Sequence, residues 1–243
     1  MIKMKIKLLV WLLVLLCLPL ALSGCGESKS DVRLGNVLIL GDSYSTFGGH
    51  IPEGYPPYYY EDVEYINVDE VEETWWSIVA SRCESTVALN ESYSGSTVCH
   101  TGYGGDCKAT SFVTRFERLV EDGYFEETRI DTVIILGGLN DLWSGAPLGE
   151  VKFGEISVEE QYSFLPAVAY LLQSIKATLP EAKILFAVEQ DLSDEMKVGI
   201  REICDELQVT RVELEGVSKK HSHPDKKGMV TIAEQIVAAL ENE

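Results

Sequence analysis

The chain has 243 residues, of which 46% are hydrophobic and 24% are charged, enough apolar material for one sizeable core. Its 39 Asp and Glu outnumber its 20 Lys and Arg, so the formal net charge is −19. A surface this acidic argues against nucleic acid as a partner and against docking on anionic lipid through a basic patch.

The first 24 residues are typical of an export signal. Three lysines within the first seven residues precede an apolar run over residues 8–22, which contains Pro19. This run is shorter than the roughly 20 residues that a membrane-spanning helix needs. We therefore expect the protein to be exported and residues 1–24 to be removed.

The end of this segment, "LSGC" at residues 22–25, resembles the lipobox of bacterial lipoprotein signals. The resemblance implies cleavage before Cys25, acylation of Cys25 and a protein held at a membrane of the cell envelope. A plain secretory signal with an incidental cysteine is the alternative. Residues 25–34 would then form a tether, and residues 35–243 a single domain.

Five short apolar runs rich in Val, Ile and Leu are predicted to be buried parallel strands, with helical patterns between them. The predicted strands are Asn36–Leu40, Thr86–Leu89, Asp131–Leu136, Lys183–Val188 and Thr210–Leu214. In the helical pattern before the fourth strand, Pro166 is predicted to bend or interrupt the helix. The alternation predicts an α/β fold, a three-layer αβα sandwich around a five-stranded parallel sheet.

Four unusual segments follow predicted strands. They are "GDSYS" after the first strand, "NESYSGST" after the second, "GGLND" after the third and "KKHSHPDKKG" after the fifth. Ligands of such sheets lie beyond the carboxyl ends of the strands. We therefore expect these four segments to meet in one crevice.

"GDSYS", "SGS", "GGLND" and "HSHP" stand in the order of the four blocks of the SGNH, or GDSL-type, serine hydrolase superfamily, which the chain resembles from Gly41 to Pro224. The resemblance implies a flavodoxin-like fold and a serine esterase. A metal-dependent phosphoesterase is not favoured, because the segments supply too few ligands for a two-metal site. No phosphate-binding glycine motif follows the first strand, so neither a metal nor a cofactor is predicted.

The resemblance implies specific roles for four residues. Ser43 is the expected nucleophile and His223, just before Pro224, is its expected base, because serine needs a base within hydrogen-bonding reach. The oxyanion would be bound by the backbone N–H of Ser43, the backbone N–H of Gly95 and the side-chain amide of Asn140. The ordinary alternatives are a helix cap for the serine and turn positions for the glycine and the asparagine.

The chain departs from the superfamily at the acid that usually stands three residues before the histidine, where it has Lys220. A carboxylate at that place selects the imidazole tautomer and stabilises the imidazolium. Three substitutes are open. A backbone carbonyl could accept from Nδ1–H, which gives a Ser-His dyad; Glu215, or Glu189 with Asp191, could supply the acid; or His221 could relay the proton or bind substrate.

A long aromatic segment lies between the nucleophile and the second strand. Its residues Tyr58 and Tyr59 are predicted to contact substrate, by stacking on a sugar ring or by covering the crevice. A Pro/Tyr-rich loop that packs on itself is the open alternative.

Other polar residues in the loops carry weaker expectations. Asp141 is predicted to bond nearby backbone, and His50 and His100 are predicted to be solvated loop residues, with substrate contact as the alternative. Cys99 and Cys107 bracket a Gly-rich loop, and a local disulfide between them would suit an exported protein.

The sequence thus predicts a surface-anchored serine esterase, with a glycan or other small acyl ester as its substrate and a carbohydrate O-acyl ester as the expected class. The alternative is a catalytically weak or inactive protein of the same fold that binds glycans. Hydrolysis that depends on Ser43 distinguishes the two.

Overall fold

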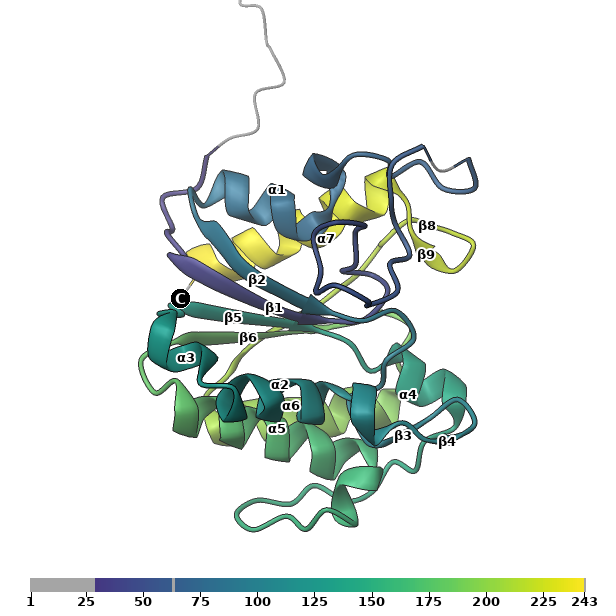
Figure 1. The fold of residues 1–243 in the computed structure, drawn as a ribbon, viewed down its shortest axis with the longest axis vertical. Helices are drawn as coiled ribbons and strands as arrows, with labels where there is room; N and C mark the ends of the chain where they lie inside the picture. The colour runs from purple at the N-terminus through teal and green to yellow at the C-terminus, as the bar shows by residue number, and fades with distance from the viewer. Residues whose placement is uncertain (1–28, 63, 243) are drawn as a thin grey trace, which may run out of the picture.

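Five parallel strands form the centre of the molecule, in the spatial order β2-β1-β5-β6-β7 (Figure 1). The computed structural model describes residues 29–62 and 64–242. The strands are β1 (Asn36–Gly41), β2 (Thr86–Ser92), β5 (Thr132–Leu136), β6 (Lys183–Val188) and β7 (Thr210–Glu213). The predicted α/β fold with a five-stranded parallel sheet is confirmed.

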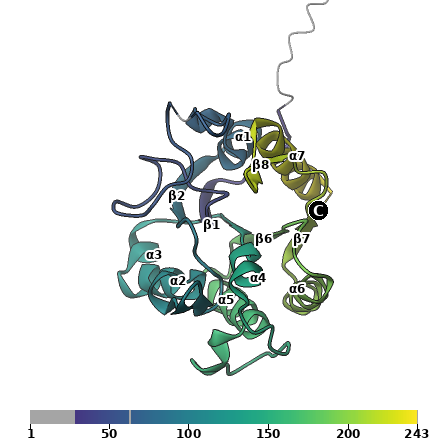
Figure 2. The ribbon, with the colours of Figure 1, turned by 90° about the vertical axis from the view of Figure 1, so that its right-hand side faces the viewer.

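Helices cover both faces of the sheet, as Figures 1 and 2 show. One face carries α1 (Trp75–Arg82) and α7 (Lys226–Glu241), which pack against each other. The other face carries α2 (Phe112–Glu121), α3 (Tyr124–Glu127), α5 (Phe164–Thr178) and α6 (Asp194–Leu207). The short helix α4 (Leu139–Ser144) follows β5.

Two small hairpins and three single turns of 3-10 helix complete the described chain. The hairpins are β3 (Thr101–Gly102) with β4 (Gly105–Asp106), and β8 (Lys219–Lys220) with β9 (His223–Pro224). The 3-10 turns are η1 (Val71–Glu73), η2 (Lys108–Thr110) and η3 (Glu160–Tyr162).

The core lies between the sheet and the two helix layers. Because both faces of the sheet are covered, the strands are continuous apolar runs rather than alternating ones, and every residue of β5 is buried. On α7 the buried Ile232, Ile236 and Leu240 recur every four residues and form one apolar face. Burying each such side chain contributes about 1.5–3 kcal/mol.

Pro166 does not bend a helix, so that part of the prediction is wrong, although the predicted helical stretch is interrupted just before it. Helix α5 begins at Phe164, so Pro166 lies in its first turn. The N–H groups of a first turn have no partner within the helix, so proline loses nothing there. The preceding residues form the separate turn η3.

The predicted signal segment, residues 1–24, and Cys25 lie outside the described residues. Export and acylation therefore stay predictions. Among the described helices, none combines the length and the apolar character needed to cross a membrane.

A buried arginine ties together the carboxyl ends of β1 and β2. Arg115 of α2 donates from Nη2 to Gly41 O at 3.0 Å and to Ser96 Oγ at 3.1 Å, and from Nη1 to Glu91 O. Its Nε donates to Thr110 O at 3.0 Å. Burial lowers the pKa of the Arg115 guanidinium to about 10, so the group stays charged at neutral pH.

Arg115→Met is expected to cost about 3 kcal/mol of unfolding free energy, because it removes a charged donor from the buried carbonyls of Gly41 and Glu91 and from Ser96 Oγ. Urea unfolding measures this loss. The exposed Arg118→Met on the same helix is the matched control and should change stability by less than about 1 kcal/mol. Equal losses in the two variants would contradict the role of Arg115.

Candidate active site

The four motif segments meet at the carboxyl edge of the sheet, as the sequence predicts. The turn after β1 carries Ser43, whose Oγ lies 2.9 Å from Nε2 of His223 on β9. Asn140 of α4 donates from Nδ2 to the carbonyl of Ser96 at 2.9 Å, in the loop after β2. The same Nδ2 lies 3.4 Å from Oδ2 of Asp42, the residue before the serine.

A tight turn holds Ser43 out of the sheet. Ser45 N donates to Asp42 O at 3.0 Å, and Tyr44 N donates to Asp42 Oδ1 at 2.9 Å. A Cβ on Gly41 would lie 2.4 Å from Ser45 Oγ, so only glycine lets the turn fold back on the end of β1. The residue pattern "GDS" therefore has a steric reason.

Helix α1 and β2 fix the far side of the same turn. Both indole N–H groups of α1 donate to Ser45, that of Trp75 to Oγ at 3.2 Å and that of Trp76 to the carbonyl at 2.9 Å. Asn90 Nδ2 donates to the same carbonyl at 2.8 Å. Three side chains thus hold Ser45, the residue two places beyond Ser43.

His223 stands on a hairpin with a two-residue turn. His221 and Ser222 form that turn with φ of 51° and 63°, and Lys220 pairs with His223 across it. Positive φ at both central residues is the geometry of a type I′ turn, which glycine and asparagine favour. The turn next to the His223 imidazole is therefore formed by two residues that are not glycine, although positive φ is uncommon for such residues.

Two tyrosine hydroxyls hold this hairpin. Tyr44 OH donates to the carbonyl of Ser222 at 2.6 Å, and Tyr59 OH donates to the carbonyl of Pro224 at 2.8 Å. Tyr59 is fully buried, so the prediction that it contacts substrate is wrong. Its hydroxyl binds backbone instead, because a buried phenol needs a polar partner.

The hydrogen bonds of His223 define its tautomer. Nδ1 lies 3.1 Å from the carbonyl oxygen of His221. Because a carbonyl only accepts, the proton of neutral imidazole stands on Nδ1, and Nε2 offers a lone pair to the Ser43 hydroxyl. This is the backbone-carbonyl arrangement, the first of the three substitutes for the missing acid.

Burial lowers the pKa of His223 below its usual value of 6.5. The bond from Nδ1 to the His221 carbonyl opposes this effect, and the nearby ammonium of Lys219 adds to it. The imidazole is therefore neutral at pH 7 and able to accept a proton.

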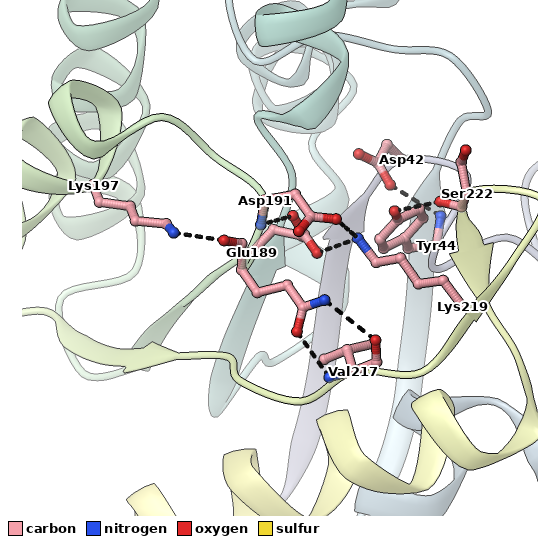
Figure 3. A network of polar contacts seen from close by, with 9 residues as sticks. Asp42, Tyr44, Glu189, Asp191, Lys197, Val217, Lys219 and Ser222 are labelled. Carbon is pink, nitrogen blue, oxygen red and sulfur yellow. Dashed lines mark hydrogen bonds and ion pairs between the residues drawn. The ribbon is translucent and has the colours of Figure 1, made fainter.

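The carboxylates considered as substitutes bind elsewhere (Figure 3). Lys219 Nζ lies 2.5 Å from Oε1 of the buried Glu189 and 2.6 Å from Oδ2 of Asp191. The same ammonium stands 5.1 Å from the ring centre of Tyr44. Glu215 is exposed, and its N–H binds Gln235. Neither of the two substitutes that supply an acid matches this geometry.

Three donors are available for an oxyanion. Gly95 has a φ of 81°, which glycine adopts freely. Within the described chain, neither its N–H nor that of Ser43 donates to another group. The amide of Asn140 is oriented by Tyr103, whose hydroxyl donates to Oδ1 at 3.2 Å and so leaves Nδ2 facing the site.

Two buried carboxyl groups lie beside these donors. Burial raises the pKa of Asp42 to about 7 and that of Asp141 to about 6. Asp141 accepts from Val98 N at 2.9 Å and from Cys99 N at 3.0 Å. The Asp141 carboxylate therefore shapes the loop after β2 by binding backbone, as expected.

The substrate contacts predicted for His221 and Tyr58 stay predictions. His221 is exposed at the hairpin tip, and Tyr58 is half-buried against His223. His50 is exposed, but His100 is fully buried with Nε2 at 3.2 Å from Gln161 Oε1, so the prediction of a solvated His100 is wrong. Burial lowers the pKa of His100 to about 4.

No disulfide joins Cys99 and Cys107, which are both free thiols in the described structure. Cys107 N donates to His100 O at 2.7 Å, so Cys107 pairs with the neighbour of Cys99. The described residues also contain no cluster of three or more His, Cys, Asp or Glu suited to a metal ion.

Sequence reasoning missed Tyr44, Lys219 and Tyr103. Tyr44 lies within "GDSYS" and Lys219 within "KKHSHP", so both were in view as neighbours of motif residues. Nothing in the pattern shows that the Tyr44 phenol binds the hairpin turn or that Lys219 binds two acids 30 and 28 positions earlier in the chain. Tyr103 lies at the tip of the β3–β4 hairpin, which no sequence signal predicted.

The family of the chain follows from comparison with known proteins. The model of the family "GDSL-like Lipase/Acylhydrolase" matches residues 35–240, so the chain belongs to that family. No curated protein matches the chain.

Solved structures agree. A protein from Bacteroides ovatus ATCC 8483 named as a GDSL-like lipase is 35% identical, with a TM-score of 0.80, over 87% of this chain and 100% of its own. A second GDSL-like lipase, from Bacteroides uniformis ATCC 8492, is 36% identical, with a TM-score of 0.78, over 86% of this chain and 97% of its own. A family two carbohydrate esterase from Clostridium thermocellum, in complex with cellohexaose, shares the fold at 16% identity and a TM-score of 0.60, over 86% of this chain and 65% of its own.

Lys219→Met is expected to lower the free energy of unfolding by about 3 kcal/mol, because it leaves the buried carboxylate of Glu189 without its counter-charge. Thermal or urea unfolding measures the loss. The double variant Lys219→Met/Glu189→Gln should recover part of it, since a neutral amide tolerates burial better than an unpaired charge.

Lys220→Met is the matched control for that measurement, because Lys220 is the exposed neighbour of Lys219 on the same strand. Its stability should stay within about 0.5 kcal/mol of the parent. Equal losses for the two lysines would show that the ion pair does not hold the hairpin.

Proposed function

We propose that the protein is an exported serine esterase that hydrolyses an acyl ester through an acyl-enzyme on Ser43. One observation carries this proposal: Ser43 Oγ lies 2.9 Å from Nε2 of His223, and the other ring nitrogen of His223, Nδ1, faces the carbonyl of His221. Hydroxyl, base and base-orienting group therefore stand in the order that nucleophilic catalysis requires. Membership of the acylhydrolase family supports the same reaction class.

In the first half-reaction, Ser43 Oγ attacks the carbonyl carbon of the ester while its proton passes to Nε2 of His223. The carbonyl oxygen becomes an oxyanion and binds the N–H groups of Ser43 and Gly95 and the amide of Asn140. The bond to the leaving oxygen then breaks, and His223 gives its proton to the released alcohol.

In the second half-reaction, water replaces the alcohol. His223 takes a proton from the water as the water oxygen attacks the acyl carbon, and the same donors bind the second oxyanion. The Ser43 oxygen leaves, regains its proton from His223, and the carboxylic acid departs. The base ends in its starting state, so no further group is required.

The amide of Asn140 has one hydrogen to give to the oxyanion. Its bond to Ser96 O is 2.9 Å long, whereas its contact with Asp42 Oδ2 is 3.4 Å. The longer contact is the weaker one. The incoming oxyanion therefore takes the hydrogen that faces Asp42, and the bond to Ser96 keeps the amide in place.

The proposed substrate is an O-acyl ester of a carbohydrate. Two exposed aromatic rings lie beside Asn140: Tyr103, whose hydroxyl binds it, and Trp143, three residues further along α4, with 52% and 46% of their surface exposed. Aromatic faces exposed beside a site offer a platform for a sugar ring. The shared fold with a carbohydrate esterase crystallised with cellohexaose supports this class. A lipid anchor at Cys25 would hold the enzyme at the cell envelope.

Ser43→Ala and His223→Ala are each expected to reduce hydrolysis of p-nitrophenyl acetate by at least about 10³-fold, because each removes a member of one catalytic unit. Release of acetate from an acetylated oligosaccharide measures the same loss on the proposed substrate. If the parent and Ser43→Ala hydrolyse both esters at equal rates, the esterase proposal fails and a glycan-binding scaffold is the better description.

The pH profile of kcat/KM provides a separate test. His223 acts as a base only when neutral, so activity is lost as the pH falls through its pKa. Since burial lowers that pKa below 6.5, the acid limb of the profile should lie below pH 6.5. A limb at pH 7 or above would contradict the assignment of His223 as the base.

A further inference from the structure

The ring of Tyr58 lies flat on the imidazole of His223. The two ring centres are 3.4 Å apart and the planes are inclined by 7°. The other tyrosines around His223 present their edges: Tyr44 at 5.2 Å and 61°, and Tyr59 at 6.4 Å and 76°. Tyr58 thus covers one face of the base with a parallel aromatic face.

The nucleophile turn itself holds Tyr58. Its N–H donates to Thr46 Oγ1 at 2.8 Å, and that hydroxyl donates to the carbonyl of Ser43 at 3.1 Å. Its carbonyl accepts from Tyr65 OH at 2.6 Å. Thr46 therefore links Tyr58 to Ser43, so the same turn positions the Tyr58 ring and the Ser43 hydroxyl.

The hydroxyl of Tyr58 contributes nothing to this arrangement. Within the described chain, it makes no hydrogen bond, in contrast to the hydroxyls of Tyr44 and Tyr59. What Tyr58 offers to His223 is its aromatic face. A role through the ring and a role through the hydroxyl can therefore be separated by substitution.

The stacked ring of Tyr58 lies beside the imidazole, which has no carboxylate partner to stabilise its protonated form. When Ser43 gives up its proton, His223 becomes a cation, and its Nδ1 partner is an uncharged carbonyl. The ammonium of Lys219 on β8 also lies near the ring, and its positive charge disfavours the imidazolium. The face of an aromatic ring carries negative potential and attracts a cation within about 6 Å of its centre.

We propose that Tyr58 is a positioning residue that takes over the stabilisation of the imidazolium from the missing carboxylate, while the His221 carbonyl fixes the tautomer. Its ring keeps the imidazole plane aligned with Ser43 Oγ, and its face stabilises the imidazolium as the proton arrives. This inference rests on the proposed function, since it concerns the base of the esterase reaction. It assigns Tyr58 to the base, whereas the sequence suggested a contact with substrate.

Three variants test the proposal by kinetics on p-nitrophenyl acetate. Tyr58→Phe keeps the ring and should retain kcat within about twofold of the parent. Tyr58→Leu keeps apolar bulk without the ring and should lower kcat about tenfold with KM nearly unchanged. Tyr60→Leu is the control from the same tyrosine run, because Tyr60 is 44% exposed and does not contact His223, and it should match the parent.

An NMR titration of the His223 imidazole in the Ser43→Ala background gives a readout that does not depend on turnover. Leucine at position 58 removes the aromatic face while keeping the base buried, so the pKa of His223 should fall by about 0.5. Phenylalanine should leave the pKa unchanged. If the melting curve of Tyr58→Leu shows that this variant does not fold, Tyr58→Met is measured in its place.

The outcomes separate the two proposals. A parent enzyme without hydrolysis that depends on Ser43 overturns the esterase function, and the NMR titration still tests the stack. An active parent whose Tyr58→Leu variant matches Tyr60→Leu in kcat and in the pKa of His223 overturns the role of Tyr58. A rise in KM alone also overturns it, because that result marks a substrate contact. Loss of activity in Tyr58→Phe would assign the effect to the hydroxyl and likewise contradicts the proposal.

Discussion

The hydrogen bond between Ser43 and His223 joins two segments 180 positions apart, and most of the polar structure at this edge of the sheet serves it. A bond of this kind tolerates little displacement at either end. The serine end is held by Gly41, which admits the tight turn, and by the groups that bind Ser45. The histidine end is held through the backbone of its hairpin by Tyr44 and Tyr59.

Burial of polar and charged groups is the cost of this construction. Arg115 and Glu189 are almost fully buried, and each is stable there only because its partners satisfy it. Burial also raises the pKa values of Asp42 and Asp141, which lie beside the candidate oxyanion donors. The buried polar groups at this edge of the sheet therefore depend on specific partners, which the apolar core beneath it does not need.

The sheet and the central site residues were predictable from the sequence for different reasons. Buried parallel strands are uniform apolar runs, and Val133–Leu136 could hardly be anything else. Ser43, Gly95, Asn140 and His223 could be named because four weak motifs stand in one order, each after a strand. The predicted β2 was too short, because Asn90, Glu91 and Ser92 are polar yet buried. The partners of Asn90 and Glu91 are Ser45 and Tyr55, which lie in loops away from β2 and are not shown by local pattern.

The supporting groups were less predictable, since their roles depend on contacts between remote segments. The turn at His221 and Ser222 lacks the glycine or asparagine that signals a two-residue hairpin, so the β8–β9 hairpin read as a loop. Tyr58 and Tyr59 are adjacent and alike in sequence, but the ring of Tyr58 stacks on the imidazole of His223, whereas Tyr59 is fully buried with its hydroxyl on the carbonyl of Pro224. Composition of a loop cannot separate two such neighbours.

The partner of His223 Nδ1 is a main-chain oxygen only two residues upstream. Side-chain acids can be deleted by one codon change and neutralised by acid, but a peptide carbonyl is encoded by every residue type and does not titrate. The group that orients the His223 ring through Nδ1 is therefore beyond the reach of point mutation at its own position. Mutation can change the position of this carbonyl only by changing the conformation of the turn at His221 and Ser222.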